Sequence, residues 1–406
     1  RLRISREKLS YIVDSTAAPV ATLGISSWVA FQLSLIDDGY EAAGVSDHPP
    51  VFEVFVNSVP FNMYSILAIV MVFLIVGTRR DFGEMLTAER RAWTTGKVNR
   101  DDARPMQDVA AELGEPAADH PRLINFLGPV AVLVGVTIAT ALWTGGFTAS
   151  AFASDPTGAL WSGVTNAAYD QALMYGSFAM IVSGFVLGKL QGVVSLGEAT
   201  DTTIEGFGIM LTAISILALA WGIGEVVNAL GTGEYVAGVA ESVVNPAILP
   251  ALVVVIAAFM AFSTGTSWGT MGILTPIVIP VAWTITGGGA EGHTLVAAMV
   301  GAIFSGAIFG DHTSPISDTT VLSATFTGAD LVDHVRTQLY YAVTVGLVAA
   351  GLLVVWGYTR VTPLLLLPLG VVTLVGLVYG LSALDGRRRG VDPGVPDEPD
   401  ATTADD

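Results

Sequence analysis

Long apolar stretches with almost no charge constrain this sequence more than any other feature. A helix needs about 20 mainly apolar residues to cross the hydrocarbon core of a bilayer. Only 13% of the 406 residues are charged, against about 25% in ordinary soluble domains. The sequence therefore predicts an all-α polytopic membrane protein. Its apolar stretches are residues 11–36, 60–77, 123–145, 170–188, 207–230, 337–357 and 361–384, with two longer, interrupted stretches at 246–287 and 292–335.

The basic residues predict how the chain crosses the membrane. If residues 246–287 enter and return to the same face, every lysine and arginine except Arg360 lies on one side. That pattern gives about eight spans plus a re-entrant hairpin, and two full spans at 246–287 have the same parity. Loops rich in lysine and arginine stay in the cytoplasm. We therefore expect a multi-pass protein of the cell (cytoplasmic) membrane in which the start of this chain and its C-terminus are cytoplasmic.

The polar segments suggest the domain organisation. Residues 1–384 are expected to form one membrane domain, with 78–122 as a flexible cytoplasmic loop and 385–406 as an acidic, disordered cytoplasmic tail. The chain starts at Arg1 and its first methionine is Met63. No targeting segment precedes the first apolar stretch, so we expect a chain truncated at its N-terminus.

Composition excludes several classes of protein. The chain has no cysteine, which excludes disulfides, iron–sulfur clusters and a catalytic thiol. No glycine-rich phosphate loop or nucleophile–base set stands out, so we expect no enzyme and no cofactor. The net charge is -18 and no basic stripe stands apart from the membrane-flanking loops, which disfavours nucleic-acid binding. An acidic sequence whose only lysines are Lys8, Lys97 and Lys189 is typical of a halophile.

Three polar segments interrupt apolar stretches, and polar groups at membrane depth are costly unless they serve a function. The first is residues 14–22, where Asp14, Ser15 and Thr16 precede Pro19. Asp14 alternatively caps an interfacial helix start. The second is residues 263–270, where glycines and hydroxyls indicate a hairpin tip that offers oxygen ligands to a cation, unless its small residues only permit close helix packing. Its candidate ligands are Thr264, Thr266, Ser267 and Thr270.

The third polar segment, residues 310–320, is the richest in chemistry. Two carboxylates, an imidazole and several hydroxyls cannot face lipid, so the segment predicts a broken helix lining a polar pathway. It contains Asp311, His312, Ser314, Ser317, Asp318, Thr319 and Thr320. Asp14-Ser15-Thr16 resembles Asp318-Thr319-Thr320, and in the predicted topology the two run in opposite directions. This indicates an inverted-topology repeat.

Three further residues have alternative interpretations. Glu225 lies near the outer end of its predicted span, where it is a candidate proton-relay residue or a structural carboxylate. His334 and Arg336 follow the broken helix. We expect both to lie at the membrane interface, with gating contacts as the alternative.

The polar motifs also carry a family resemblance. Residues 264–270, the segment 309–320, and Asp333-His334-Val335 with Thr337-Gln338 resemble the NhaC-type Na⁺/H⁺ antiporter family. The resemblance extends from residue 8 to about 345. It implies secondary transport, paired re-entrant hairpins with broken helices, and a homodimer. It also implies that the hairpin of the first repeat lies before Arg1.

The working hypothesis is exchange of Na⁺ (or Li⁺) for protons across the bilayer by competition for buried carboxylates, because burial favours a protonated carboxylate and a bound cation favours the ionised form. Asp14 and Asp318 are the expected exchange carboxylates, with Asp311 as a second acid and His312 as a tuner of their pKa or a proton donor. The expected Na⁺ ligands are Asp14, Asp318, Thr266 and Thr319, supported by Ser15, Thr16, Thr264, Ser267, Thr270, Ser314, Ser317 and Thr320. The alternatives are a Na⁺- or H⁺-coupled malate or lactate exchanger, and a non-transporting membrane receptor or assembly protein.

Overall fold

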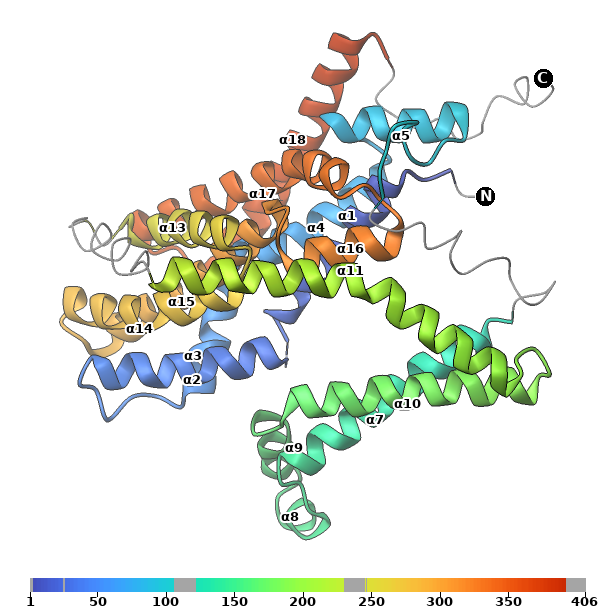
Figure 1. Ribbon diagram of the computed structural model, residues 1–406. Coiled ribbons are helices and arrows are strands. Elements are labelled where there is room, and N and C mark those ends of the chain that lie inside the picture. Colours follow the sequence, from blue (N-terminus) through green and yellow to red (C-terminus); the bar gives the residue numbers. More distant parts are fainter. Residues whose placement is uncertain (1–2, 25, 106–121, 230–244, 246, 392–406) are drawn as a thin grey trace. The chain divides into compact units, whose positions relative to one another are not determined.

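The computed structural model describes residues 3–24, 26–105, 122–229, 245 and 247–391. Every regular secondary-structure element within these residues is a helix (Figure 1). Six helices are long and apolar enough to cross a membrane, or up to seven if a bent pair forms one span. The predicted all-α polytopic class is confirmed. The number of qualifying helices is lower than the expected eight in part because the stretch 11–36 forms two helices of 16 residues each, α1 (Arg6–Ala21) and α2 (Ser27–Ala42).

The chain forms two compact units, one containing residues 24–31 and 109–211 and the other containing the rest. In the smaller unit α7 and α10 pack along each other, because Gly176 leaves room for Thr137 and the Leu133 carbonyl. Large apolar side chains such as Phe126 and Phe178 are exposed, as expected of a surface that faces lipid. The helices here are α7 (Ile124–Thr144), α8 (Ala149–Ser154), α9 (Pro156–Thr165) and α10 (Tyr169–Leu190); α11 (Leu196–Ala229) continues into the larger unit.

A helical hairpin packed on a long buried helix forms the centre of the larger unit. The hairpin consists of α13 (Leu249–Thr264) and α14 (Ser267–Thr286), which are joined by a turn at Gly265 and Thr266. The start of α13 and the end of α14 line one small cavity, so the two helices run antiparallel. Both pack against α15 (Gly289–Thr313), and Figure 1 shows the three side by side. The sequence predicted this turn from its glycines and hydroxyls.

The remaining helices of this unit surround the hairpin and α15. A break at residues 314–317 separates α15 from α16, as expected from the polar segment. The start of α1 and the end of α16 both meet the 98–99 segment, through Arg6 to Val98 and Asn99 to Gly328, so α1 and α16 run antiparallel. The inverted repeat itself stays a prediction. These helices are α1 (Arg6–Ala21), α2 (Ser27–Ala42), α3 (Val51–Ser58), η1 (Val59–Phe61), α4 (Met63–Thr78), α5 (Glu84–Thr95), α16 (Asp318–Thr327), α17 (Leu331–Thr359) and α18 (Pro363–Arg389).

Three boundaries differ from the sequence-based expectation. The stretch 11–36 is two helices, since α1 ends where the buried Thr22 hydroxyl turns back to the Pro19 carbonyl. The loop 78–122 is not a linker throughout, because it contains α5, which packs against α1 and α17. Helix α18 continues beyond residue 384 to Arg389, where Gly390 takes a left-handed conformation and ends it. Residues 392–406, most of the predicted tail, lie outside the described part of the chain.

Candidate functional site

Asp14 on α1 is the centre of a buried polar cluster. Its carboxylate is fully buried, and Gln338 on α17 donates a hydrogen bond to it at 2.7 Å. From α16, Thr320 donates at 3.2 Å and Ser323 at 3.5 Å. Three helices far apart in sequence therefore converge on one carboxylate, which is not the geometry of an interfacial helix cap. A charged group surrounded by donors in this way is typical of a functional site at membrane depth.

His334 also belongs to this cluster. Its Nε2 atom lies 3.4 Å from Asp14 Oδ2, an ion-pair distance without hydrogen-bond geometry, and its side chain is fully buried. The expectation that His334 is an interface residue that reaches toward water is therefore wrong, whereas Arg336 is exposed and its interfacial position stays a prediction. Hydropathy alone suggested the interface because His334 lies in the first turn of α17. The antiparallel packing of α1 and α16 buries that turn instead.

Asp311 lies in the last turn of α15 and organises the break that follows. Its two carboxylate oxygens accept hydrogen bonds from Ser317 at 2.6 Å and from Thr319 at 2.5 Å. Its backbone carbonyl accepts from Thr320 at 3.0 Å, and from the amide of Ser314. Carbonyls at a helix end have no partner within the helix, so these hydroxyls hold the broken helix in place. Thr320 thereby links Asp311 to Asp14.

His312 connects the break to α4. Its Nδ1 atom lies 3.0 Å from the Tyr64 hydroxyl, while its Nε2 atom is buried with no partner among the described residues. The carbonyl of His312 accepts a hydrogen bond from the same Gln338 amide nitrogen that reaches Asp14. Gln338 therefore bridges the two polar segments. Its sequence signal was its place in the resemblance motif, whereas nothing in the sequence singled out Tyr64 or Ser323.

The hairpin tip meets the break between α15 and α16. The Ser314 hydroxyl donates to the Phe262 carbonyl at 2.9 Å. Gly265 has a positive φ of 68°, and a Cβ at this position would lie 2.7 Å from the Ile316 side chain. Beside this contact, the hydroxyl of Ser267 is buried without a partner in the part of the chain that the structure describes. The two predicted polar segments, 263–270 and 310–320, are therefore in direct contact.

Other expected oxygen ligands bind within their own segments. Thr264 donates to Met260, Thr270 to the carbonyl of Thr266, and Thr16 to Ile12. The Thr266 hydroxyl caps α14 by accepting from the amide of Gly269. Ser15 is buried on α1, one residue from Asp14.

Asp318 is less buried than Asp14 and Asp311. It opens α16, and its carboxylate accepts the amide of Thr319 at 2.9 Å. Among the described residues this bond is the only direct hydrogen bond between any two of the four expected Na⁺ ligands, which are Asp14, Asp318, Thr266 and Thr319. The side chain of Glu225 lies outside the described part of the chain, so its expected relay role stays a prediction. In the described ranges no group of three or more His, Cys, Asp or Glu side chains is arranged to hold a metal ion.

The geometry can be compared with known proteins at this point. A model of the Na⁺/H⁺ antiporter family matches residues 20–358. The chain belongs to this family. The match covers the hairpin, the break at 314–317, and His334 and Gln338 on α17. The resemblance proposed from the sequence motifs is thus confirmed.

Individual relatives have different names. An uncharacterized protein of Haemophilus influenzae is 33% identical over 88% of this chain, and the chain spans 65% of that relative's length. A malate-2H⁺/Na⁺-lactate antiporter of Bacillus subtilis is 36% identical over 28% of this chain and 23% of its own. The Na⁺/H⁺ antiporter NhaC of Alkalihalophilus pseudofirmus is 30% identical over 42% of this chain and 35% of its own. No solved structure matches the chain.

Proposed function

We propose that the protein is a secondary transporter that exchanges Na⁺ for H⁺ across the membrane. The observation that supports this proposal most directly is that the Thr320 hydroxyl lies between two buried acidic residues, 3.2 Å from the Asp14 carboxylate and 3.0 Å from the backbone carbonyl of Asp311. A broken helix at such a point presents carbonyls, hydroxyls and helix ends to ions. Membership of the Na⁺/H⁺ antiporter family is consistent with the same reaction.

The mechanism follows from competition between two cations for the same oxygen atoms. Ser317 and Thr319 use their protons to bind Asp311, which leaves their hydroxyl oxygens able to accept or to ligate. A carboxylate in this site is neutralised either by a proton or by Na⁺, so binding of one disfavours the other. Asp318, partly exposed beside Asp311, would exchange cations with the aqueous side. No cofactor enters this scheme.

The test is proton movement in everted membrane vesicles, read with a pH-sensitive dye after Na⁺ addition. Asp14→Asn, Asp311→Asn and Asp318→Asn are each expected to abolish the Na⁺ response. Asp38→Asn on the exposed end of α2 is the matched control and should respond like the unmodified protein. Each variant is first checked for insertion and for a single symmetric peak in detergent. Normal exchange by inserted Asp14→Asn and Asp318→Asn variants would refute the proposal.

A second candidate function is exchange of small carboxylates such as malate or lactate. The specific observation behind it is that the buried cluster contains two imidazoles: His334 Nε2 lies 3.4 Å from Asp14, and the Nε2 atom of His312 has no partner among the described residues. The partial match to a malate-2H⁺/Na⁺-lactate antiporter is in line with it. Adding malate or lactate to the same vesicles separates the candidates. A response to the organic anion alone favours this function, and silence with all three ions favours a receptor or assembly role.

The cellular setting is part of the same proposal. Both basic ends of the chain lie at one end of the larger unit, because Arg6 bonds to Val98 near α5 and Arg389 bonds to Thr87 on α5. By the positive-inside rule, this end is cytoplasmic and the protein spans the cell membrane. We also propose a homodimer, as the family resemblance implies. Cross-linking in vesicles, resolved by gel electrophoresis, tests the dimer.

A further inference from the structure

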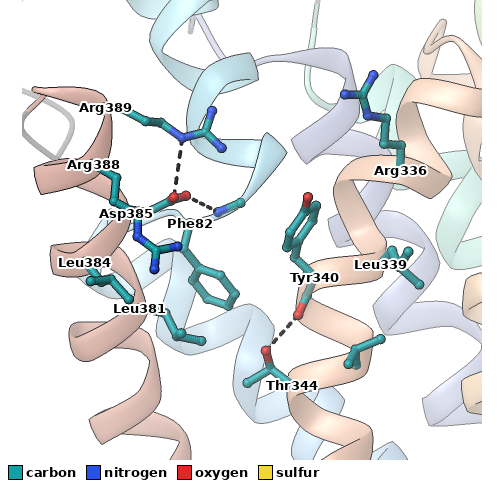
Figure 2. Close-up of a pocket in the computed structure, with 12 residues that line it drawn as sticks. Phe82, Arg336, Leu339, Tyr340, Thr344, Leu381, Leu384, Asp385, Arg388 and Arg389 are labelled. Atoms are coloured by element: carbon teal, nitrogen blue, oxygen red, sulfur yellow. Dashed lines mark hydrogen bonds and ion pairs between the residues drawn. The ribbon is translucent and has the colours of Figure 1, made fainter.

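A pocket of about 670 Å³ lies between the outer faces of α17 and α18, away from the proposed ion site. Figure 2 shows Arg336 on α17 and Arg388 and Arg389 on α18 near one end of this pocket. Most of the remaining lining is apolar, with Leu339 on α17 and Leu381 and Leu384 on α18, and it also includes Phe82, Tyr340 and Thr344. The pocket is therefore basic at one end and apolar along its walls.

The basic end carries more positive than negative charge. Asp385 is the only carboxylate in the lining, and it is already bound by the Arg389 Nε atom at 3.4 Å and by the Gly83 amide at 2.7 Å. Arg336 is 3.5 Å from Glu84, a pair whose arginine side is 61% exposed and therefore weak. Arg388 is exposed and forms no ion pair with any described residue. The guanidinium of Arg388 is thus available to an anion.

The apolar walls continue into a second groove. Leu339 and Val343 line both the pocket and a neighbouring groove of about 410 Å³ between α13, α15 and α17. The floor of this groove is almost wholly apolar and includes Phe259, Phe309 and Leu347. A ligand that follows both hollows would therefore need a long apolar part attached to an anionic end.

The length of this path fits one leaflet of a bilayer. From Arg336 to Ala350 along α17 is 14 residues, or about 21 Å at 1.5 Å per residue. Half of a bilayer with its headgroups is about 20–22 Å thick. Arg336 lies near the start of α17, the end that packs against α5, where Arg6 and Arg389 also lie. The charged end of the path is therefore expected at the headgroup level, and the apolar end is expected deeper in the bilayer.

We propose that the pocket and groove together bind one phospholipid with an anionic headgroup. The phosphate lies between Arg336 and Arg388, and one acyl chain runs over Leu339 and Val343 into the groove. Basic pockets between transmembrane helices are suited to anionic lipid headgroups. The acidic residues 392–406 match the charge, but they offer no apolar segment for the groove. The proposal does not depend on which ion or substrate the protein transports.

The experiment measures lipid retained by the purified protein with native mass spectrometry. Phosphatidylglycerol and phosphatidylcholine with identical acyl chains are compared at one ionic strength, since salt screens exposed charges. The protein should retain one phosphatidylglycerol and lose phosphatidylcholine. The double variant Arg336→Gln/Arg388→Gln should bind phosphatidylglycerol at least about tenfold more weakly. Arg387→Gln is the matched control, because Arg387 is exposed beside Arg388 but does not line the pocket.

A second variant tests the acyl chain independently of charge. Val343→Trp fills the junction of pocket and groove while keeping all three arginines, and it should also lose the lipid. The proposal is overturned if Arg387→Gln weakens binding as much as the double variant Arg336→Gln/Arg388→Gln does, since that result indicates only diffuse attraction. It is also overturned if inorganic phosphate displaces the lipid at equal concentration, or if retention requires deletion of residues 392–406.

Discussion

Gln338 is the side chain on which the two halves of the site depend, because one amide nitrogen reaches both Asp14 and the His312 carbonyl. We predict that Gln338→Leu raises the KM for Na⁺ by about tenfold with a smaller change in kcat. A hydrogen bond to a charged group contributes about 1.5–3 kcal/mol, and without it the proton competes more strongly for Asp14. Vesicle transport at several Na⁺ concentrations measures the effect.

The control for this variant is Thr373→Val on the exposed face of α18, which should leave KM unchanged. Gln338→Asn keeps an amide and should recover part of the affinity if the amide donor is what matters. A fall in kcat alone, with KM intact, would contradict the positioning role of Gln338.

The contacts of the buried Asp81 carboxyl give a prediction about how stability depends on pH. The carboxyl of Asp81 contacts Lys8 at 2.9 Å and Tyr341 at 2.6 Å, and Lys8 also contacts Glu89 of α5 at 3.3 Å. Burial raises the pKa of Asp81, although Lys8 opposes this shift. A carboxyl whose pKa is raised on folding stabilises the fold at low pH, and this contribution is lost as the pH rises through the folded-state pKa.

We therefore predict that Asp81→Asn lowers Tm more at pH 4.5 than at pH 7.5. The unmodified protein gains from Asp81 protonation only at the lower pH, and the asparagine variant lacks this gain. Thermal unfolding in detergent, followed by intrinsic fluorescence, measures both values, with the exposed Asp38→Asn as the control. An Asp81→Asn penalty that grows from pH 4.5 to 7.5 would show that the Lys8 ion pair outweighs burial.

At the scale of elements, the hairpin turn has the most stringent geometry. Gly265 has a left-handed backbone and touches Ile316 in the break between α15 and α16. Gly287, which ends α14, has almost the same φ of 69° but open space around it. Gly265→Ala and Gly287→Ala therefore introduce the same backbone strain, about 1–2 kcal/mol, and only the first also introduces a clash.

We predict that both variants lower Tm, and that Gly265→Ala alone also impairs exchange. The clash separates the hairpin tip from residues 314–317, and ligand positions at the site shift with it. Thermal unfolding and vesicle transport on the same preparations test the pair. Equal transport by both variants would mean that the contact between hairpin and break is structural only.

The elements also show what sequence can and cannot predict. Hydropathy and polar interruptions located the hairpin turn and the break after α15, because those signals are local to the chain. Helix α5 was missed because its mixed charges resemble a linker, and they pair with distant residues such as Glu7, which binds Arg91. His334 and Gln338 were missed as Asp14 partners for the same reason, since more than 300 residues separate α1 from α17.

At the scale of the whole molecule, the orientation in the membrane gives the last prediction. Helix α17 contains 29 residues, about 43 Å at 1.5 Å per residue, which exceeds the hydrocarbon thickness of about 30 Å. Its far end, at Thr359, and the loop end of α5, at Thr95, are both exposed. The basic segments lie with α5, so Thr95 is expected on the cytoplasmic side and Thr359 on the outer side.

The absence of cysteine from this sequence makes the test direct. Thr95→Cys should react with a membrane-impermeant thiol reagent in everted vesicles and not in right-side-out vesicles, and Thr359→Cys should show the opposite pattern. The unmodified chain provides the background, and reaction after detergent addition confirms that each thiol is reactive. His334 and Gln338 lie near the start of α17, the end that packs against α5. The expected labelling pattern would therefore place the Asp14 cluster nearer the cytoplasmic face. The reverse pattern would exclude a cytoplasmic position for both basic ends of the chain.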